Sequence, residues 1–186
     1  MTRRRLTNAG TDKRWVRWSL LTVPTILLMG MLSGGLAGSG YGNPWFDLLR
    51  KPAIMPPAWV FPSAWSTLYV LMGIAVALVL GTRGGKKRSI AITLFLIQLA
   101  LNLTWSPIFF AQHRIMLAFG IILAILFWAA MTTILFWRIR RVAGWLMLPY
   151  LAWLMFAGIL NWQIHRLNPY GISLVPAWGN TQIIVQ

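Results

Sequence analysis

The chain has 186 residues, of which 58% are hydrophobic and 10% are charged, and its formal net charge is +15. An average soluble domain carries about 25% charged residues, and a domain of this size cannot bury so much apolar surface, which excludes an ordinary soluble protein. The basic residues form short clusters between long apolar runs, which excludes the continuous basic surface that nucleic acid needs and indicates lipid headgroups as the partner.

The predicted elements follow a basic N-terminal segment, residues 1–17. Five segments without Asp, Glu, Lys, Arg or His are long and apolar enough to cross a bilayer as helices: residues 18–39, 63–82, 90–111, 116–137 and 144–164. We therefore predict an all-α membrane protein, a bundle of five transmembrane helices over residues 18–168, followed by a C-terminal tail, residues 169–186. Short links between the later spans predict antiparallel neighbours.

Basic residues divide unequally between the two sides of this bundle. Five spans place thirteen of the 17 Lys and Arg residues on the N-terminal side: six before the first span, four after the second and three after the fourth. The positive-inside rule then predicts an integral, multi-pass protein with a cytoplasmic N-terminus. The alternative reading of the first span is a signal peptide, because a basic start and apolar stretch precede the small-residue run at residues 33–38.

The segment 40–62, between the first two spans, is too long for a simple turn. It contains five aromatic residues and five prolines, which restrict the backbone: Tyr41, Trp45, Phe46, Trp59 and Phe61, with Pro44, Pro52, Pro56, Pro57 and Pro62. Such a segment either caps a cavity as a lid or anchors at the headgroups as part of an aromatic belt. The sequence leaves both interpretations open.

The third span places polar and aromatic side chains on one helical face. Gln98, Asn102, Trp105 and Phe109 are spaced i, i+4, i+7 and i+11, and Pro107 is expected to kink the end of this helix. Polar side chains in lipid are costly, so this face should look into the bundle. Amides in such positions also serve as interhelical hydrogen bonds without any ligand, and this alternative stays open.

Two further spans repeat this pattern. In the fifth span Tyr150, Trp153, Ala157 and Asn161 share a face, and in the second span Trp65, Tyr69 and Gly73 do. Three faces of this kind predict a pocket for a flat, largely apolar ligand that needs a few hydrogen bonds. In the first span Gly30, Gly34 and Gly38 predict close helix packing, either within the bundle or in a homodimer.

Residues for ordinary catalysis are missing from the spans. Cysteine is absent, the acids are Asp12 and Asp47, and the two histidines, His113 and His165, fall at span ends, where an interfacial role is expected. No paired carboxylates, Ser/His/Asp set, phosphate loop or metal-ligand spacing is present. We expect no metal, no required cofactor and no general acid–base enzyme. Proton-coupled transport and ion conduction are disfavoured, because no span holds an ionisable group.

Three stretches carry a resemblance to a known family. The first includes Trp45, Lys51-Pro52, Pro56-Pro57-Ala58-Trp59, Trp65 and Leu68-Tyr69; the second is Gln98-Leu99-Ala100-Leu101-Asn102 with Trp105 through Phe110; the third is Pro149 through Trp153 with Phe156-Ala157, Leu160-Asn161 and Arg166-Leu167-Asn168. They are similar to motifs of the TspO/translocator family, also called tryptophan-rich sensory proteins or peripheral benzodiazepine receptors. They follow the family's order over about two thirds of the chain.

The resemblance implies a five-helix bundle, often dimeric, whose pocket is closed by the loop after the first helix. It implies pocket roles for five residues and lid roles for Trp45 and Pro52; the five are Trp65, Asn102, Trp105, Trp153 and Ala157. The family binds porphyrins, isoquinoline carboxamides and benzodiazepines, and cholesterol in animal members. Trp162 stands where the family's cholesterol motif has tyrosine, so cholesterol is not predicted here.

We therefore expect a membrane receptor or sensor that binds a tetrapyrrole such as protoporphyrin IX or haem. Its ring would stack among Trp65, Trp105 and Trp153, and its propionates would meet Arg50 or Lys51 at the mouth, near Trp59. The alternatives are a light- and oxygen-dependent porphyrin-degrading enzyme, a porphyrin or sterol transporter, and a purely structural membrane protein.

Overall fold

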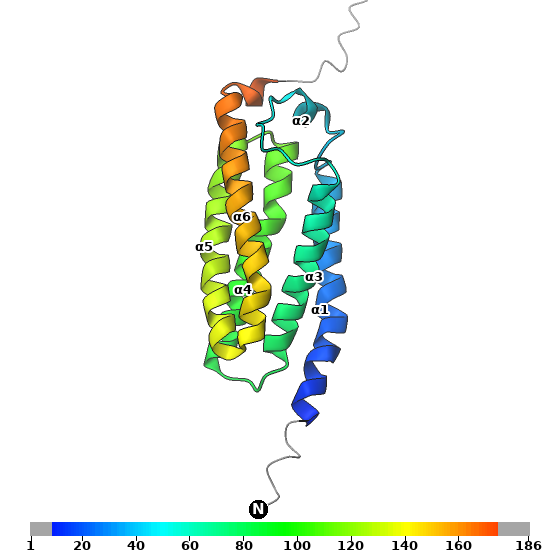
Figure 1. Cartoon of the computed structure of the whole chain (residues 1–186), viewed down its shortest axis with the longest axis vertical. Helices are drawn as coiled ribbons and strands as arrows, with labels where there is room; N and C mark the ends of the chain where they lie inside the picture. The colour runs from blue at the N-terminus through cyan, green and yellow to red at the C-terminus, as the bar shows by residue number, and fades with distance from the viewer. Residues whose placement is uncertain (1–8, 175–186) are drawn as a thin grey trace, which may run out of the picture.

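Long helices lie side by side along one axis of the molecule in this computed structural model (Figure 1). The structure describes residues 9–174, with side chains from Arg14 onward, so parts of both predicted terminal segments lie outside the described residues. The five long helices are α1 (Ala9–Leu36), α3 (Val60–Leu80), α4 (Lys86–Ser106), α5 (Ile115–Ile139) and α6 (Arg141–Leu167). The shorter ones are α2 (Pro44–Leu48), the π-helix η1 (Pro107–Ala111) and the 3₁₀-helix η2 (Gly171–Ser173).

All five long helices have the length and apolar composition to cross a membrane, and the described residues contain no strand. The predicted all-α class and the five spans are thereby confirmed. Most helix ends differ by a few residues from the prediction, and α1 begins at Ala9 rather than residue 18. The helices continue into the basic flanks because Lys and Arg are good helix formers whose long side chains can reach the headgroups.

The long helices form a closed ring in the order α1, α3, α6, α5, α4, each packed on the next and α4 on α1. The predicted neighbour pairs α4–α5 and α5–α6 are present. Helix α3, in contrast, packs mainly on α1 and α6, and it touches α4 only lightly although their link is short. A cavity lies between α3 and α4, and both helices line it.

Glycine sets the close approach of α1 and α3. A Cβ atom on Gly73 would lie 2.7 Å from Cα of Val23, and one on Gly81 would lie 2.9 Å from Cβ of Trp15. The hydroxyl of Thr22 donates a 2.8 Å hydrogen bond to the carbonyl of Gly73 across the same contact. The sequence pattern had assigned close packing to glycines of α1 instead.

Those glycines of α1 have other neighbours. Gly30 packs against the ring of Tyr69, which agrees with packing inside the bundle, but nothing from another helix lies close to Gly34 or Gly38. Gly38 has φ +60° and begins the turn after α1, where Gly40 and Gly42 also have positive φ. L-residues with a Cβ rarely adopt this conformation, so the turn requires glycine.

Two buried clusters hold the bundle together. The larger one joins α1, α3, α4, α5 and α6 and includes Met72, Phe95, Phe136 and Met147. The smaller one, near the top of Figure 1, joins α2 to η1, α5 and α6 and includes Trp45 and Phe109. We call residues 37–59, which connect α1 to α3, the lid. The predicted segment was 40–62, so α1 ends earlier and α3 begins earlier than expected.

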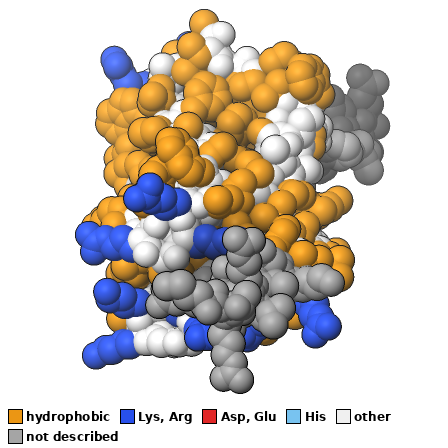
Figure 2. All heavy atoms as spheres, turned by 60° about the horizontal axis from the view of Figure 1, so that its bottom comes forward, with side chains coloured by type: hydrophobic (Ala, Val, Ile, Leu, Met, Phe, Trp, Pro, Cys, Tyr) orange, Lys and Arg blue, Asp and Glu red, His pale blue; other side chains and the backbone are white. Residues whose placement is uncertain are grey.

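The outer surface suits a bilayer. Large hydrophobic side chains such as Leu20, Leu28, Leu96 and Phe127 are exposed along the helices. Figure 2 brings the lower end of the bundle forward and shows Lys and Arg side chains around it, with a hydrophobic surface above them. This charge distribution is typical of a helix bundle whose basic end lies among lipid headgroups.

Candidate functional site

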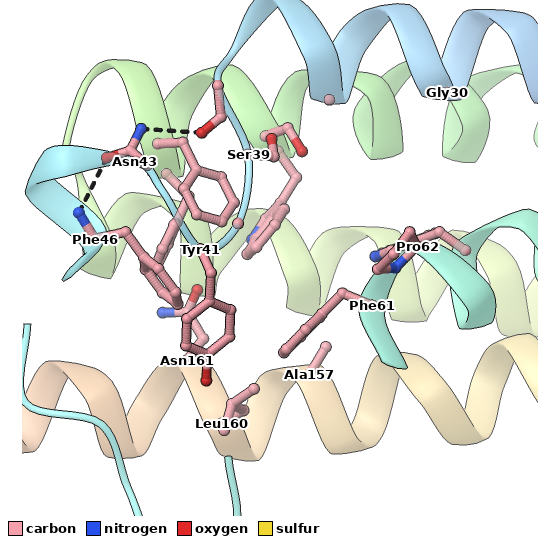
Figure 3. A pocket seen from close by; sticks show the side chains of 18 of the residues that line it. Gly30, Ser39, Tyr41, Asn43, Phe46, Phe61, Pro62, Ala157, Leu160 and Asn161 are labelled. Carbon is pink, nitrogen blue, oxygen red and sulfur yellow. Dashed lines mark hydrogen bonds between the residues drawn. The ribbon is translucent and has the colours of Figure 1, made fainter. Parts of the chain in front are cut away.

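A cavity of about 790 Å³ occupies the lid end of the bundle, and its surface is mostly apolar (Figure 3). Helices α1, α3, α4 and α6, the π-helix η1 and the lid all contribute lining residues. The volume falls within the range of about 300–1,000 Å³ that is usual for small-molecule sites in proteins.

Eight of the twelve side chains predicted to bind ligand line this cavity. They come from the three predicted faces: Trp65, Tyr69, Asn102, Trp105, Phe109, Trp153, Ala157 and Asn161. The helical periodicity of the sequence therefore placed these faces on a common interior space. Gly30, Gly34 and Gly35 of α1 and Gly38 of the lid also line the cavity, and they add no side-chain bulk to it.

The other four predicted residues are buried outside the lining. Gln98 and Tyr150 lie behind Asn102, and Trp45 and Pro52 lie inside the lid. The predicted mouth residues Arg50, Lys51 and Trp59 are not among the lining residues either. Trp59 is 69% exposed at the start of α3 and faces outward.

A chain of hydrogen bonds crosses the bundle behind the cavity. The Tyr69 hydroxyl donates to Asn102 Oδ1 (3.0 Å), Asn102 Nδ2 donates to the Tyr150 hydroxyl (3.1 Å), and that hydroxyl donates to Gln98 Oε1 (2.9 Å). All four side chains are buried. The network ties α3, α4 and α6 together, so Gln98 and Tyr150 have the structural role that the alternative interpretation of the amides allowed.

Aromatic rings form much of the cavity wall. Trp105 stacks on Phe109 with 5.1 Å between ring centroids, and Trp65 stacks on Tyr69 at 5.3 Å. Trp153 meets Trp65 edge to face at 6.4 Å. These contacts hold the rings in fixed orientations. The side chains would therefore lose less conformational entropy when a flat ligand binds.

Three buried polar atoms of the wall have no hydrogen-bond partner among the described residues: Nε1 of Trp105, Nε1 of Trp153 and Oδ1 of Asn161. Buried polar groups are usually paired, and an unpaired one costs stability. All three residues line the cavity. These atoms have almost no accessible surface, so they lie within the wall behind the surface that a ligand would meet.

The lid is ordered by its own short helix. Asn43 caps α2 by accepting a 3.0 Å hydrogen bond from the backbone N–H of Phe46, and Pro44 occupies the first turn. At the other end, the Lys51 ammonium donates to the carbonyls of Phe46, Asp47 and Leu49. The start of α2 could have been predicted from the sequence, because Asn before Pro, followed by an acid in the first turn, is typical of a helix N-terminus.

The lid is also bound to the C-terminal end of α6. The backbone N–H of Arg50 donates to Asn168 Oδ1 (2.8 Å), and Asn168 Nδ2 donates to the Arg50 carbonyl (2.9 Å). One buried asparagine thus satisfies both backbone groups of a lid residue. We had expected Arg50 only as a propionate partner; its backbone holds the lid, and its side chain is exposed.

Lys51 is poorly placed for a ligand anion. Burial lowers the pKa of its ammonium, while the nearby Asp47 carboxylate acts in the opposite direction. Its ammonium already donates to three lid carbonyls, which leaves no free N–H for a propionate. Lys51 thus has no free donor for a propionate, and Arg50 lies outside the lining residues.

The end of α4 is a π-helix rather than the simple kink expected from Pro107. The wider turn η1 buries both Phe109 and Phe110, although they are consecutive. Phe110 lines the cavity and was missed, because a regular α-helix would have turned it about 100° away from Phe109. Phe61 and Leu160 also line the cavity without having been predicted.

The two histidines lie outside this site. His113 follows η1 with φ +58° and stacks on Trp45 at 4.4 Å between centroids, and both histidines line a second, smaller cavity at the end of α5. Within the described residues, no three His, Cys, Asp or Glu side chains lie together as a candidate metal site.

Fold and site define a class: a five-helix membrane protein with an aromatic pocket that the loop after the first helix helps to line. The chain belongs to the TspO/MBR family, whose model matches residues 22–167.

The chain is 37% identical over 153 residues to protein CrtK of Rhodobacter capsulatus, covering 80% of this chain and 94% of the relative. It is 39% identical over 146 residues to the tryptophan-rich protein TspO of Chlorobaculum tepidum, covering 74% of this chain and 90% of the relative. It is 37% identical over 142 residues to the human translocator protein, covering 75% of this chain and 84% of the relative. The resemblance of the three motif stretches is confirmed.

Proposed function

We propose that this chain is an integral membrane receptor that binds tetrapyrroles such as protoporphyrin IX in the aromatic cavity. Isoquinoline- and benzodiazepine-like compounds would occupy the same space. The observation that carries the proposal is the cavity of about 790 Å³, walled by Trp65, Trp105 and Trp153 and backed by the Asn102 network. A flat aromatic molecule gains from stacking on these rings, and the few polar groups fix its orientation.

Titration of the purified protein with protoporphyrin IX, followed by tryptophan fluorescence, tests this proposal. We expect saturable quenching in the micromolar range or tighter. Trp153→Ala and Asn102→Ala should each weaken binding about tenfold or more, because one removes a wall ring and the other a polar anchor of the cavity.

The matched control is Trp145→Ala. Trp145 lies on the same helix as Trp153 but is 59% exposed on the outer surface, so its loss should leave the binding constant unchanged. Linear quenching without saturation, equal in the wild type and in Trp153→Ala, would show partition into detergent and would refute the proposed pocket.

The same sample distinguishes a receptor from an enzyme and from a transporter. Under light and oxygen, a new pigment spectrum with turnover that Trp65→Phe abolishes would establish porphyrin degradation. Flux of porphyrin across vesicles would establish transport. Saturable binding with neither product nor flux is the outcome that a receptor requires.

We further propose that the N-terminus faces the cytoplasm. The support is the basic end of the bundle, where α1 begins and where the α3–α4 and α5–α6 links lie (Figures 1 and 2). A membrane-impermeant maleimide on a Cys introduced at Gly85 tests this, with Cys at exposed Tyr170 as the opposite-side control. In intact cells, labelling is expected at position 170 and not at position 85; the reverse pattern would show the opposite orientation.

A further inference from the structure

The outer side of the lid exposes large apolar side chains. Leu48 is 53% exposed, Ile54 45% and Trp59 69%, and none of the three lines either of the two cavities described above. The inner side is different, because Trp45 and Phe46 are buried against η1, α5 and α6. The lid thus has two apolar sides, and the protein covers only one of them.

The link at the opposite end of the bundle has another composition. Residues 81–85, between α3 and α4, consist of three glycines, Thr82 and Arg83, and none of them is a large hydrophobic residue. Lys and Arg side chains gather at that end and suit polar headgroups (Figure 2). The lid exposes apolar side chains instead, which indicates a different environment, because contact of apolar surface with water is unfavourable.

The lengths of two helices indicate the height of the lid in the membrane. Helix α3 has 21 residues and spans about 32 Å, which matches a hydrocarbon core of about 30 Å. Helix α6 has 27 residues and is about 9 Å longer, and α2 lies above the end of α3, level with the upper part of α6 (Figure 1). The headgroup layer adds about 5–8 Å on each side of the core. The lid, which fills the step between the two helix ends, therefore lies at the level of the headgroups.

The three charged residues of the lid are compatible with this level. The Asp47 carboxylate accepts a 3.0 Å hydrogen bond from the backbone N–H of Gly42, and the Lys51 ammonium donates to three lid carbonyls. Arg50 is exposed, and its long side chain can reach a phosphate while its stem stays in apolar surroundings. Two of the charges are thus satisfied within the lid, and the third has the sign that binds a phosphate.

We infer that the outer side of the lid binds the phospholipids around the protein, with Leu48, Ile54 and Trp59 at the boundary between acyl chains and headgroups. The exposed apolar surface of the helices continues toward this side at Leu36, which is 87% exposed where α1 ends and the lid begins. Lipid is thus the partner that covers the second apolar side of the lid. This inference concerns the surface of the lid and does not depend on which ligand the cavity takes.

A consequence for the opening of the lid follows. The lid is enclosed between the helix bundle on one side and phospholipid on the other. Opening therefore displaces lipid in addition to breaking the hydrogen bonds that join the lid to Asn168 and Gly171.

Site-directed spin labelling of the full-length protein in phospholipid nanodiscs tests the inference, and the chain has no cysteine of its own to interfere. Leu48→Cys, Ile54→Cys and Trp59→Cys each carry a nitroxide in turn. Collisions with O₂, which concentrates among acyl chains, are compared with collisions with a water-soluble nickel chelate. The controls are Gly85→Cys, which has open space around it, for water, and Leu28→Cys, 59% exposed on α1, for hydrocarbon.

The expected result is intermediate between the two controls. The ratio of O₂ to nickel collisions at the three lid positions should exceed the ratio at position 85 about threefold or more, because apolar side chains at an interface lie below the headgroups. It should stay below the ratio at position 28, which lies among the acyl chains.

Three results would overturn the inference. A ratio at all three lid positions equal to that at position 85 would show that the lid faces water. Protection from both probes would show that protein, such as a second copy of this chain, covers the lid. A lipid signal at position 59 alone would restrict the lipid contact to the start of α3. Titration with protoporphyrin IX does not enter these measurements, so the failure of the proposed function and the failure of this inference are distinguishable.

Discussion

The indole Nε1 of Trp45 donates a 2.7 Å hydrogen bond to the carbonyl of Gly171, joining two residues 126 positions apart in the chain. Trp45 is 1% exposed and also packs edge to face on Phe109, a cavity residue. The lid is therefore attached at two points, to η2 through Trp45 and to the C-terminal end of α6 through the pairing of Arg50 with Asn168.

Trp45→Phe should loosen the lid without removing its apolar contact. The substitution leaves the buried Gly171 carbonyl without its donor, which costs about 1–3 kcal/mol. We expect faster backbone hydrogen exchange in residues 37–59 and a shorter ligand residence time. Trp59→Phe, in the same loop but exposed, is the control and should change neither rate.

Tyr150→Phe should destabilise the bundle. The change removes one hydroxyl that links Gln98 and Asn102, and it leaves both amides short of a partner inside the membrane. Interhelical hydrogen bonds in membranes contribute about 0.6–1.7 kcal/mol each, so we expect a loss of about 1–2 kcal/mol in unfolding in mixed micelles. Tyr170→Phe, at a 79% exposed site, should have no effect, and equal stability of both variants would contradict the network.

Gly73→Ala should disrupt the contact between α1 and α3. The new Cβ would lie 2.7 Å from the backbone of Val23, which cannot move aside as a flexible side chain would, and overpacking of this kind costs about 1–3 kcal/mol. Gly120→Ala is the matched control within α5, where no atom lies within 4 Å. It should raise stability by about 0.5–1 kcal/mol through helix propensity, as measured by thermal unfolding of both variants.

His113 should make the lid sensitive to acid. Burial lowers the pKa of its imidazole below 6.5, although a hydrogen bond with the backbone of Phe110 acts in the opposite direction. The unfolded protein then binds the proton first, so stability is full above about pH 6.5 and falls as the pH drops through the lower pKa of the folded state. We expect hydrogen exchange of the lid to accelerate below this pH.

His113→Asn tests the assignment, because asparagine tolerates the positive φ of this position but does not titrate. The acid-dependent acceleration should disappear in this variant. Its persistence would assign the effect to another group.

The number of helices and the three inward faces could be predicted because lipid imposes a simple rule: apolar residues face outward and polar ones inward. Periodicity gave the direction of Gln98 and Tyr150 correctly but not their depth behind Asn102. A single helix carries no information on which inward residue lies against a cavity and which lies against another helix.

Two features depended on contacts that the sequence does not encode locally. Helix α1 comes close to α3 at Gly73 and Gly81 because Val23 and Trp15 cross α3 at these points. The glycines that were predicted to pack, Gly30, Gly34 and Gly38, line the cavity. Trp45 was predicted as a lid residue, but the partner of its indole N–H, Gly171, lies in the predicted tail, for which no motif was available.

The π-helix at Pro107–Ala111 also changes what a one-residue deletion would do. A π-turn holds one residue more than an α-turn, so deleting one residue from this turn would restore a regular helix and leave the flanking residues in their present phase. His113 would then keep its stacking contact with Trp45. The cavity wall at the end of α4 could therefore be shortened by one residue while the lid contact stays in place.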